Sequence, residues 1–110
     1  MNSKLNQNNH LTFNEQCYQL LFKIPKGRIT TYKAIAEALN SKAYQAVGNA
    51  MNRNPNPITV PCHRVVNADG QLGGYAFGQD KKIELLTQEG IVINNNRVQD
   101  FKTVLYDFTE

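Results

Sequence analysis

The sequence predicts a mainly α-helical domain with a few short strands and a helix-turn-helix near its centre. Three observations lead to this prediction. A helix-start signal near residue 12 precedes an apolar stripe, two short amphipathic segments follow with only a brief polar break, and stretches rich in proline or glycine separate these from a last amphipathic segment. The 110 residues fit one domain. We expect residues 11–110 to form it, and the Asn-rich residues 1–10 to be a disordered tail.

The first helix is predicted to begin at Thr12, because Thr12 and Glu15 have the spacing of a capping box. Pro25 and Gly27 are expected to end it. Between these limits apolar side chains recur as one helical stripe: Phe13, Cys17, Leu20, Leu21 and Ile24. Cys17 belongs to this stripe, so we interpret it as a small buried hydrophobic residue.

Two short helices are predicted after an extended link at 29–31, with 40–42 as the break between them. Their expected inner faces are Tyr32, Ile35, Ala36 and Leu39, and then Tyr44, Val47, Gly48 and Met51. A tight break between two such helices is typical of a helix-turn-helix, although many helical hairpins share the pattern. The outer face of the second helix is polar and almost uncharged. It is either a solvated face or a surface that contacts nucleic acid through amides.

The rest of the chain alternates rigid connectors and turns with one more helix. Residues 54–57 contain two prolines and are expected to be a stiff connector, and 67–70 and 94–96 are expected to be turns. The glycines of 73–78 favour close approach of the backbone to a flat ligand over a phosphate-binding loop. A last helix is predicted at about 79–89, with Ile83 and Leu86 inside and Gly90 as its stop.

Composition narrows the class of protein. The net charge of +3 permits a polyanionic partner without demanding one. No apolar run approaches the roughly 18 residues that span a bilayer, and the first ten residues lack the apolar segment of a secretory signal. Two cysteines cannot build a disulfide framework. We therefore expect a reducing compartment, cytoplasm or nucleoid (the nucleus in a eukaryote), no membrane association, and a free thiol at Cys62.

Cys62 and His63, in the stretch VPCHRVV, are the residues most indicative of chemistry. A thiol attacks as the thiolate, and a neighbouring histidine favours its formation. Adjacent residues of an extended segment point to opposite sides, so direct contact of the two side chains would need a bend or a bridging water. Glu89 is a candidate to orient the imidazole. A zinc site is disfavoured, because only His10 and Cys17 remain as further His or Cys ligands, and a cysteine hydrolase is a poor match.

Several motifs in one order resemble the O6-alkylguanine-DNA alkyltransferase family. The central one is PCHRV, residues 61–65. The others are Gly27-Arg28, Thr31-Tyr32, Ala46-Val47-Gly48-Asn49-Ala50-Met51, Arg53-Asn54-Pro55, Gly73-Gly74-Tyr75 and Glu89-Gly90. The resemblance covers about residues 11–91. It implies a winged-helix-like DNA-binding domain of the kind found at the C-terminus of these repair proteins, which take an alkyl group from guanine onto their own cysteine in a single turnover.

The resemblance also implies roles in the reaction. Cys62 would be the alkyl acceptor, His63 would draw its proton through a water, and Glu89 would orient His63. Asn54 would buttress the active-site turn by hydrogen bonds. Tyr32 would donate a hydrogen bond to a guanine extruded from the duplex. No cofactor and no metal is implied.

The same resemblance implies contacts to the extruded base. Met51 and Tyr75 would pack on its ring, the carbonyls of Cys62 and Val65 would accept from its exocyclic amine, and the backbone amide of Ala76 would face O6. The protein would act as a monomer on double-stranded DNA that contains O6-alkylguanine, with O6-methylguanine as the main lesion.

DNA would be bound through the minor groove by the second helix of the helix-turn-helix, at Gln45, Ala46, Gly48, Asn49, Asn52 and Arg53. Small residues at Ala46, Gly48 and Ala50 suit close approach to DNA. Candidate phosphate contacts are Lys33, Lys42, Arg53 and Arg64. Of these, Arg64 fits better as a member of an internal structural pair.

Three departures from the family pattern bear on function. Gln45 stands where the family usually has an intercalating arginine, so we expect weaker binding or altered extrusion. Phe77, in the substrate pocket, replaces a common glycine and should disfavour large adducts such as benzyl. The N-terminal domain of most repair members is absent from this sequence.

The small size raises one alternative: the alkyltransferase-like proteins, which bind alkylated DNA and recruit excision-repair proteins, but replace the acceptor cysteine. Because Cys62, Tyr32, His63 and Glu89 are all present, transfer is the preferred hypothesis. A plain DNA-binding regulator is weaker, since no basic footprint or dimer interface is evident and PCHRV would have no role.

Overall fold

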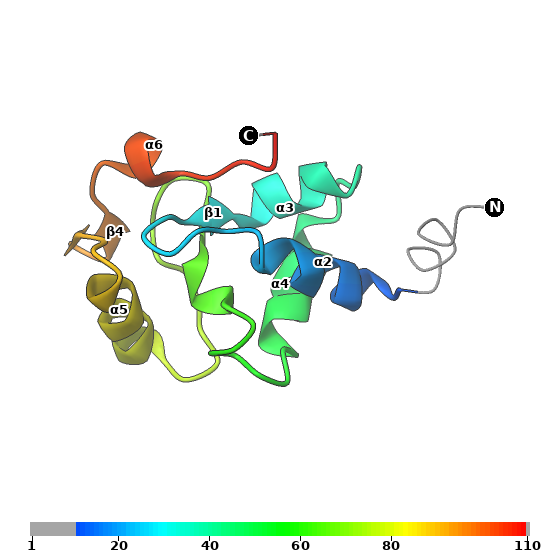
Figure 1. The fold of residues 1–110 in the computed structure, drawn as a ribbon, viewed down its shortest axis with the longest axis horizontal. Coiled ribbons are helices and arrows are strands. Elements are labelled where there is room, and N and C mark those ends of the chain that lie inside the picture. The colour runs from blue at the N-terminus through cyan, green and yellow to red at the C-terminus, as the bar shows by residue number, and fades with distance from the viewer. Residues whose placement is uncertain (1–10, 110) are drawn as a thin grey trace.

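The computed structural model of the protein describes residues 11–109 and is mainly helical, with four very short strands (Figure 1). The predicted tail at residues 1–10 lies outside the described residues. The elements in chain order are α2 (Phe13–Leu21), β1 (Thr30–Thr31), α3 (Tyr32–Ala38), α4 (Tyr44–Asn52), a single 3₁₀ turn η1 (Cys62–Arg64), β2 (Val65–Val66), α5 (Gln79–Gln88), β3 (Ile93–Asn94), β4 (Arg97–Val98) and α6 (Phe101–Val104). The predicted fold class is confirmed.

Helix α2 begins as its sequence predicts. The Thr12 hydroxyl accepts a hydrogen bond from the backbone N–H of Glu15, and the Glu15 carboxylate accepts one from the N–H of Thr12. The helix ends at Leu21, and the chain continues in a tighter turn in which the N–H of Ile24 donates to the carbonyl of Leu21. Ile24 is still buried, as is Cys17, so the apolar stripe was predicted correctly although its last member lies beyond the helix.

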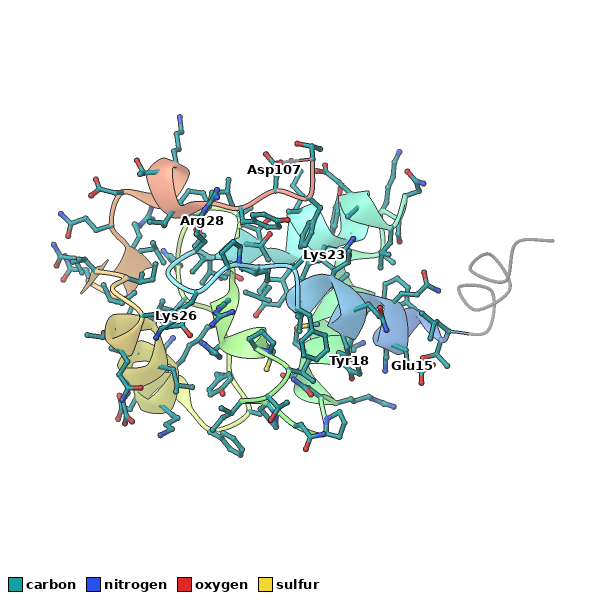
Figure 2. All side chains as sticks on the ribbon, viewed as in Figure 1. Glu15, Tyr18, Lys23, Lys26, Arg28 and Asp107 are labelled. Carbon is teal, nitrogen blue, oxygen red and sulfur yellow. The ribbon has the colours of Figure 1, made fainter. Side chains whose placement is uncertain are left out.

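Helices α3 and α4 pack on each other as a helix-turn-helix, and α4 also packs on α2. Figure 2 shows Tyr18 reaching from α2 toward α4, where its hydroxyl donates to the carbonyl of Ala50 at 2.8 Å. The buried stripe of α4 is Val47, Ala50 and Met51. The predicted inner face was therefore wrong for two of its members: Tyr44 is 42% exposed in the first turn, and Gly48 lines an open groove. The suggestion that Ala50 approaches DNA is also wrong, because Ala50 is fully buried.

The strand after the cysteine divides two hydrophobic cores. Strands β1 and β2 pair in parallel, with Thr30 opposite Val65 and Thr31 opposite Val66. Successive residues of a strand point to opposite sides. Val65 accordingly joins the core built by α2, α3 and α4, while Val66 joins a second core with Leu86 of α5. The cysteine turn is thus held between two packed units.

Residues 91–109 form a hairpin, a short helix and an extended segment that runs back along residues 28–29. Asn95 and Asn96 adopt positive φ in the tight turn that joins antiparallel β3 and β4, which confirms the turn predicted there. After α6, Leu105 forms a β-bridge with Ile29, and the Arg28 guanidinium lies 5.4 Å from the centre of the Tyr106 ring. Four-residue α6 was not predicted, because so short a helix shows no periodicity.

Within residues 11–109, no helix combines the length and apolar character needed to cross a membrane. The same residues contain no cluster of three or more His, Cys, Asp or Glu side chains that could hold a metal ion.

Candidate active site

Cys62 opens the 3₁₀ turn η1, at the end of the proline-containing connector. Asn54, itself buried, braces this connector at two points: its side-chain nitrogen donates to the carbonyl of Val60 at 2.9 Å, and its oxygen accepts from the N–H of Asn56 at 2.9 Å. The predicted role of Asn54 as a support for the turn therefore has a structural counterpart. The residues from Cys62 to Arg64 form a helical turn directly after Pro61, so the chain bends here and is not extended.

The Cys62 thiol is covered, with only 4% of the residue exposed. Burial raises the pKa of Cys62, and the hydrogen bond from Asn54 and the positive charge of Lys82 oppose this increase only in part. The thiol therefore carries its proton at neutral pH and needs a base before it can attack. Cys17 lacks such opposing groups, and burial raises its pKa to about 11, as expected for a structural cysteine.

His63 is held from one side by a carboxylate. Its Nε2 lies 2.9 Å from Oε2 of Glu89, which is the C-cap residue of α5. An ionised carboxylate only accepts hydrogen bonds, so Nε2 carries the proton and Nδ1 keeps a free lone pair. Nδ1 is buried and has no hydrogen-bond partner among residues 11–109. The predicted pairing of His63 with Glu89 is present, and it leaves one basic nitrogen vacant.

Arg64 completes the carboxylate's environment. Its Nε donates to Oε1 of Glu89 at 2.8 Å, its Nη2 donates to Oε2 at 2.7 Å, and its Nη1 donates to the carbonyl of Ile24 at 2.9 Å. This forked geometry makes a strong, directional pair. Arg64 is thus an internal structural residue, as preferred from the sequence, and not a phosphate contact.

These contacts set the charges of His63, Glu89 and Arg64, which we call the relay. Burial lowers the pKa of His63, and the hydrogen bond and charge of Glu89 offset that effect only partly, so the imidazole is neutral at pH 7. Burial alone would raise the pKa of Glu89, but the hydrogen bonds from Arg64 and His63 outweigh it and the net direction is downward. A neutral base beside an ionised carboxylate is the arrangement that accepts a proton readily.

Lys82 is a member of the site that the sequence did not reveal. It is fully buried in α5, and its ammonium donates to three backbone carbonyls, those of Val65 at 2.7 Å, Gly74 at 2.9 Å and Leu72. Burial lowers its pKa to about 8. The lysine ties the strand after Cys62 to the glycine loop. The only signal in the sequence is its position four residues before Leu86, on the buried stripe of α5.

Tyr32 and Tyr75 both lie near enough to Cys62 to interact with its charge. Burial and, to a smaller extent, the charge of Cys62 raise the pKa of each, to about 12 for Tyr75. The Tyr75 hydroxyl lies 3.5 Å from the carbonyl of Pro57. Gly73 has a φ of +71°, and a Cβ there would lie 3.4 Å from the Tyr32 hydroxyl. The glycine loop is thereby able to pass close to Tyr32.

The other predicted substrate contacts differ in burial. Met51 and Val65 are buried in the helical core, whereas Ala76 and Phe77 are exposed in the glycine loop. Phe77 packs edge-to-face on Tyr75, with ring centres 5.8 Å apart, and is 56% exposed. That it narrows the substrate pocket stays a prediction.

Predicted DNA contacts from α4 meet in an open groove of about 500 Å³, which we call the α4 groove. It is lined by Tyr32, Lys33, Tyr44, Gln45, Gly48, Asn49, Asn52, Asn67 and Ala68. Ala46 and Arg53 do not line it: Ala46 is half-buried, and Arg53 is the exposed C-cap of the helix. A Cβ added to Gly48 would meet nothing within 4 Å, so packing within the described protein does not require a glycine here.

Comparisons of the sequence with known proteins agree on one family. Residues 12–91 match the family model described as 6-O-methylguanine DNA methyltransferase, DNA binding domain. A methylated-DNA–protein-cysteine methyltransferase of Methanosarcina barkeri is 49% identical over 78 residues, which are 70% of this chain and 49% of the relative. The chain thus spans about half the length of that methyltransferase.

Two solved structures share the fold. Mycobacterium tuberculosis OGT in complex with DNA matches with a TM-score of 0.69 and 40% identity, covering 72% of this chain and 50% of that one. The structure of S. pombe Atl1 in complex with damaged DNA containing O6-carboxymethylguanine matches with a TM-score of 0.74. The match covers 86% of this chain and 94% of that one. At 23% identity, the second likeness concerns the fold alone.

Proposed function

Because the chain belongs to the family of the 6-O-methylguanine DNA methyltransferase DNA-binding domain, we propose that it repairs O6-alkylguanine, mainly O6-methylguanine, in double-stranded DNA by transferring the alkyl group to Cys62. Each molecule would act once, as a monomer, in the compartment that holds the DNA. The observation that carries the proposal is the arrangement beside the thiol. His63 is anchored through Nε2 by Glu89, while its Nδ1 is buried and unpaired.

The proposed reaction begins with removal of the thiol proton. Nδ1 of His63 takes the proton of Cys62 through a bridging water, and Glu89 stabilises the imidazolium that results. The sulfur then attacks the alkyl carbon, so that the C–S bond forms as the bond from that carbon to O6 breaks. Tyr32 donates a hydrogen bond to the departing guanine. Overall, the thiol loses one proton and the guanine gains one, so no cofactor is needed.

Access to the thiol requires that the guanine leave the duplex. O6 lies on the major-groove edge of the guanine, at its base-pairing side, so a protein bound in the minor groove reaches it only after the nucleotide is extruded into a pocket. The α4 groove provides a surface for the surrounding DNA, with amide side chains and Lys33 along it. Tyr32 lines this groove and also lies close to Cys62, so it connects the two regions.

Intact mass measurement tests the proposal directly. After incubation with a duplex that contains one O6-methylguanine, the protein should gain one methylene in stoichiometric yield, located on Cys62. Cys62→Ala should abolish the gain. Cys17→Ala is the matched control, since it removes the other buried thiol and should leave the gain intact.

A second function is favoured by one observation, namely that the fold matches almost the whole length of S. pombe Atl1. The protein would then bind O6-alkylguanine DNA and recruit excision-repair proteins, with little or no transfer. Tight binding to the methylated duplex without any mass change in the same experiment would support this alternative and contradict transfer.

A further inference from the structure

Extrusion of a base leaves a gap in the stack and an unpaired partner on the other strand. Proteins that open the duplex from the minor groove fill such gaps with apolar or aromatic side chains. Every base also offers a π face on which an aromatic side chain stacks regardless of sequence. If the proposed function holds, a side chain of the α4 groove must therefore fill the gap, and the residues that line the groove define the candidates.

Tyr44 and Gln45 stand side by side at the start of α4, and both are exposed. Tyr44 is 42% exposed in the first turn of this helix, although the pattern of apolar residues predicted it to face inward. Its side chain has no hydrogen bond or ring contact within residues 11–109. Nothing in the described fold therefore requires an aromatic ring at this position.

The other aromatic residue of the α4 groove, Tyr32, is not equivalent. It is half-buried at the start of α3, next to the glycine loop and Cys62. Gln45 contributes an amide, which hydrogen-bonds but stacks poorly. Lys33 contributes a charge suited to a phosphate. Tyr44 is thus the ring in this groove that is placed to stack outside the reaction centre.

The turn after Tyr44 allows close approach. Gly48 lies on the same side of α4, one helical turn further along, and a Cβ there would point into open space. A glycine in a helix interior weakens the helix. Close approach of a partner at this position would explain why Gly48 is nevertheless a glycine. If the DNA backbone lies against Gly48, the first turn of α4 enters the minor groove.

From these positions we infer that Tyr44 is the positioning residue that stacks in the gap left by the extruded guanine, while Gln45 hydrogen-bonds the orphaned base. The inference rests on the proposed function. It assigns the extrusion step to an aromatic ring, without a cation at either position. Tyr44 does not touch the reacting atoms, so it affects delivery of the base and not the transfer itself.

The test compares two substrates of Cys62. One is a duplex with a single O6-methylguanine, which must be extruded, and the other is the free base O6-methylguanine, which needs no extrusion. With the duplex, Tyr44→Ala should slow single-turnover alkylation about tenfold or more. The free base should react with Tyr44→Ala as fast as with the wild type. Tyr44→Phe keeps the ring and should restore the duplex rate.

A third substrate and a control variant separate stacking from other effects. With O6-methylguanine opposite an abasic site, where extrusion is easier, the defect of Tyr44→Ala should shrink. Phe22→Ala is the matched control, because Phe22 is an exposed aromatic residue outside the α4 groove, and its duplex rate should equal that of the wild type.

Two results would overturn the inference: an unchanged duplex rate for Tyr44→Ala, or an equal loss of rate with the free base, which would place Tyr44 at the reaction centre. Failure of the proposed function looks different. In that case wild-type Cys62 gains no alkyl group from either substrate.

Discussion

The relay beneath Cys62 and the α4 groove differ in how completely the protein satisfies its own side chains. In the relay, Glu89 accepts three hydrogen bonds, two from nitrogens of Arg64 and one from His63. In the same region, Lys82 donates to three backbone carbonyls. In the groove, Tyr44 is exposed without a partner in the described chain, and Gly48 faces open space. Within residues 11–109, the first region pairs the charged groups of Glu89, Arg64 and Lys82 and leaves Nδ1 of His63 as its unpaired polar atom. The second region exposes an aromatic ring and a bare helix turn that the described chain does not cover.

This difference separates two kinds of residue by the effect of replacing them. A residue whose polar groups are paired inside the protein contributes to stability and to chemistry together, so its loss should reduce both. A residue kept for an absent partner contributes to neither until the partner binds. Its replacement should weaken DNA binding while leaving the fold unchanged or more stable.

The largest effect is expected for Glu89→Gln. The glutamine keeps an amide oxygen that can accept from Nε2–H of His63, but it lacks the negative charge that stabilises the imidazolium, so the transfer rate should fall about 100-fold or more. The forked pair with Arg64 is weakened as well, which should lower the free energy of unfolding by about 1–3 kcal/mol. Single-turnover kinetics and chemical denaturation measure the two quantities.

Glu84→Gln is the control, since Glu84 lies in the same helix with its side chain 51% exposed and pairs only with Lys81. Its loss should change stability by less than about 1 kcal/mol and leave transfer unaffected. Equal losses of transfer rate and stability in the two variants would mean that the pairing of Glu89 with His63 and Arg64 has no special role.

Lys82→Met is expected to act next most strongly. The methionine fills similar space but leaves three buried carbonyls without their donor, so the free energy of unfolding should fall by about 2–3 kcal/mol. The transfer rate should fall too, because the strand after Cys62 and the glycine loop lose their common anchor. Lys81→Met, one residue away on an exposed side chain, should be nearly neutral. A denaturation midpoint unchanged by Lys82→Met would contradict this account.

The smallest effect, opposite in sign, is expected for Gly48→Ala. The added methyl meets nothing in the described protein and favours the helix, so the free energy of unfolding should rise by about 0.5–1 kcal/mol. Affinity for a methylated duplex should nevertheless fall, because the methyl occupies the α4 groove. Thr87→Ala, on the exposed face of α5, should raise stability without changing affinity. Unchanged DNA affinity in Gly48→Ala would show that DNA does not approach this turn.

Local patterns in the sequence determined much of the architecture. The capping box at Thr12, the break between α3 and α4 and the asparagine turn near residue 95 each depend on contacts between close neighbours, and each is present as predicted. Cys62 and His63 were singled out by their chemistry. Glu89 was proposed as the partner of His63, and the structure brings the two together across 26 residues of sequence.

Only the tertiary structure decided how side chains far apart in the sequence share space. Lysine is usually a surface residue. Lys82 is buried because three carbonyls from two separate segments accept hydrogen bonds from its ammonium group. Tyr44 continues an apolar pattern, yet it is exposed because the packing of α2 and α3 covers Val47, Ala50 and Met51 instead. Periodicity describes one helix at a time. Which face is covered, and which polar group finds a partner, depends on elements that only the folded chain brings together.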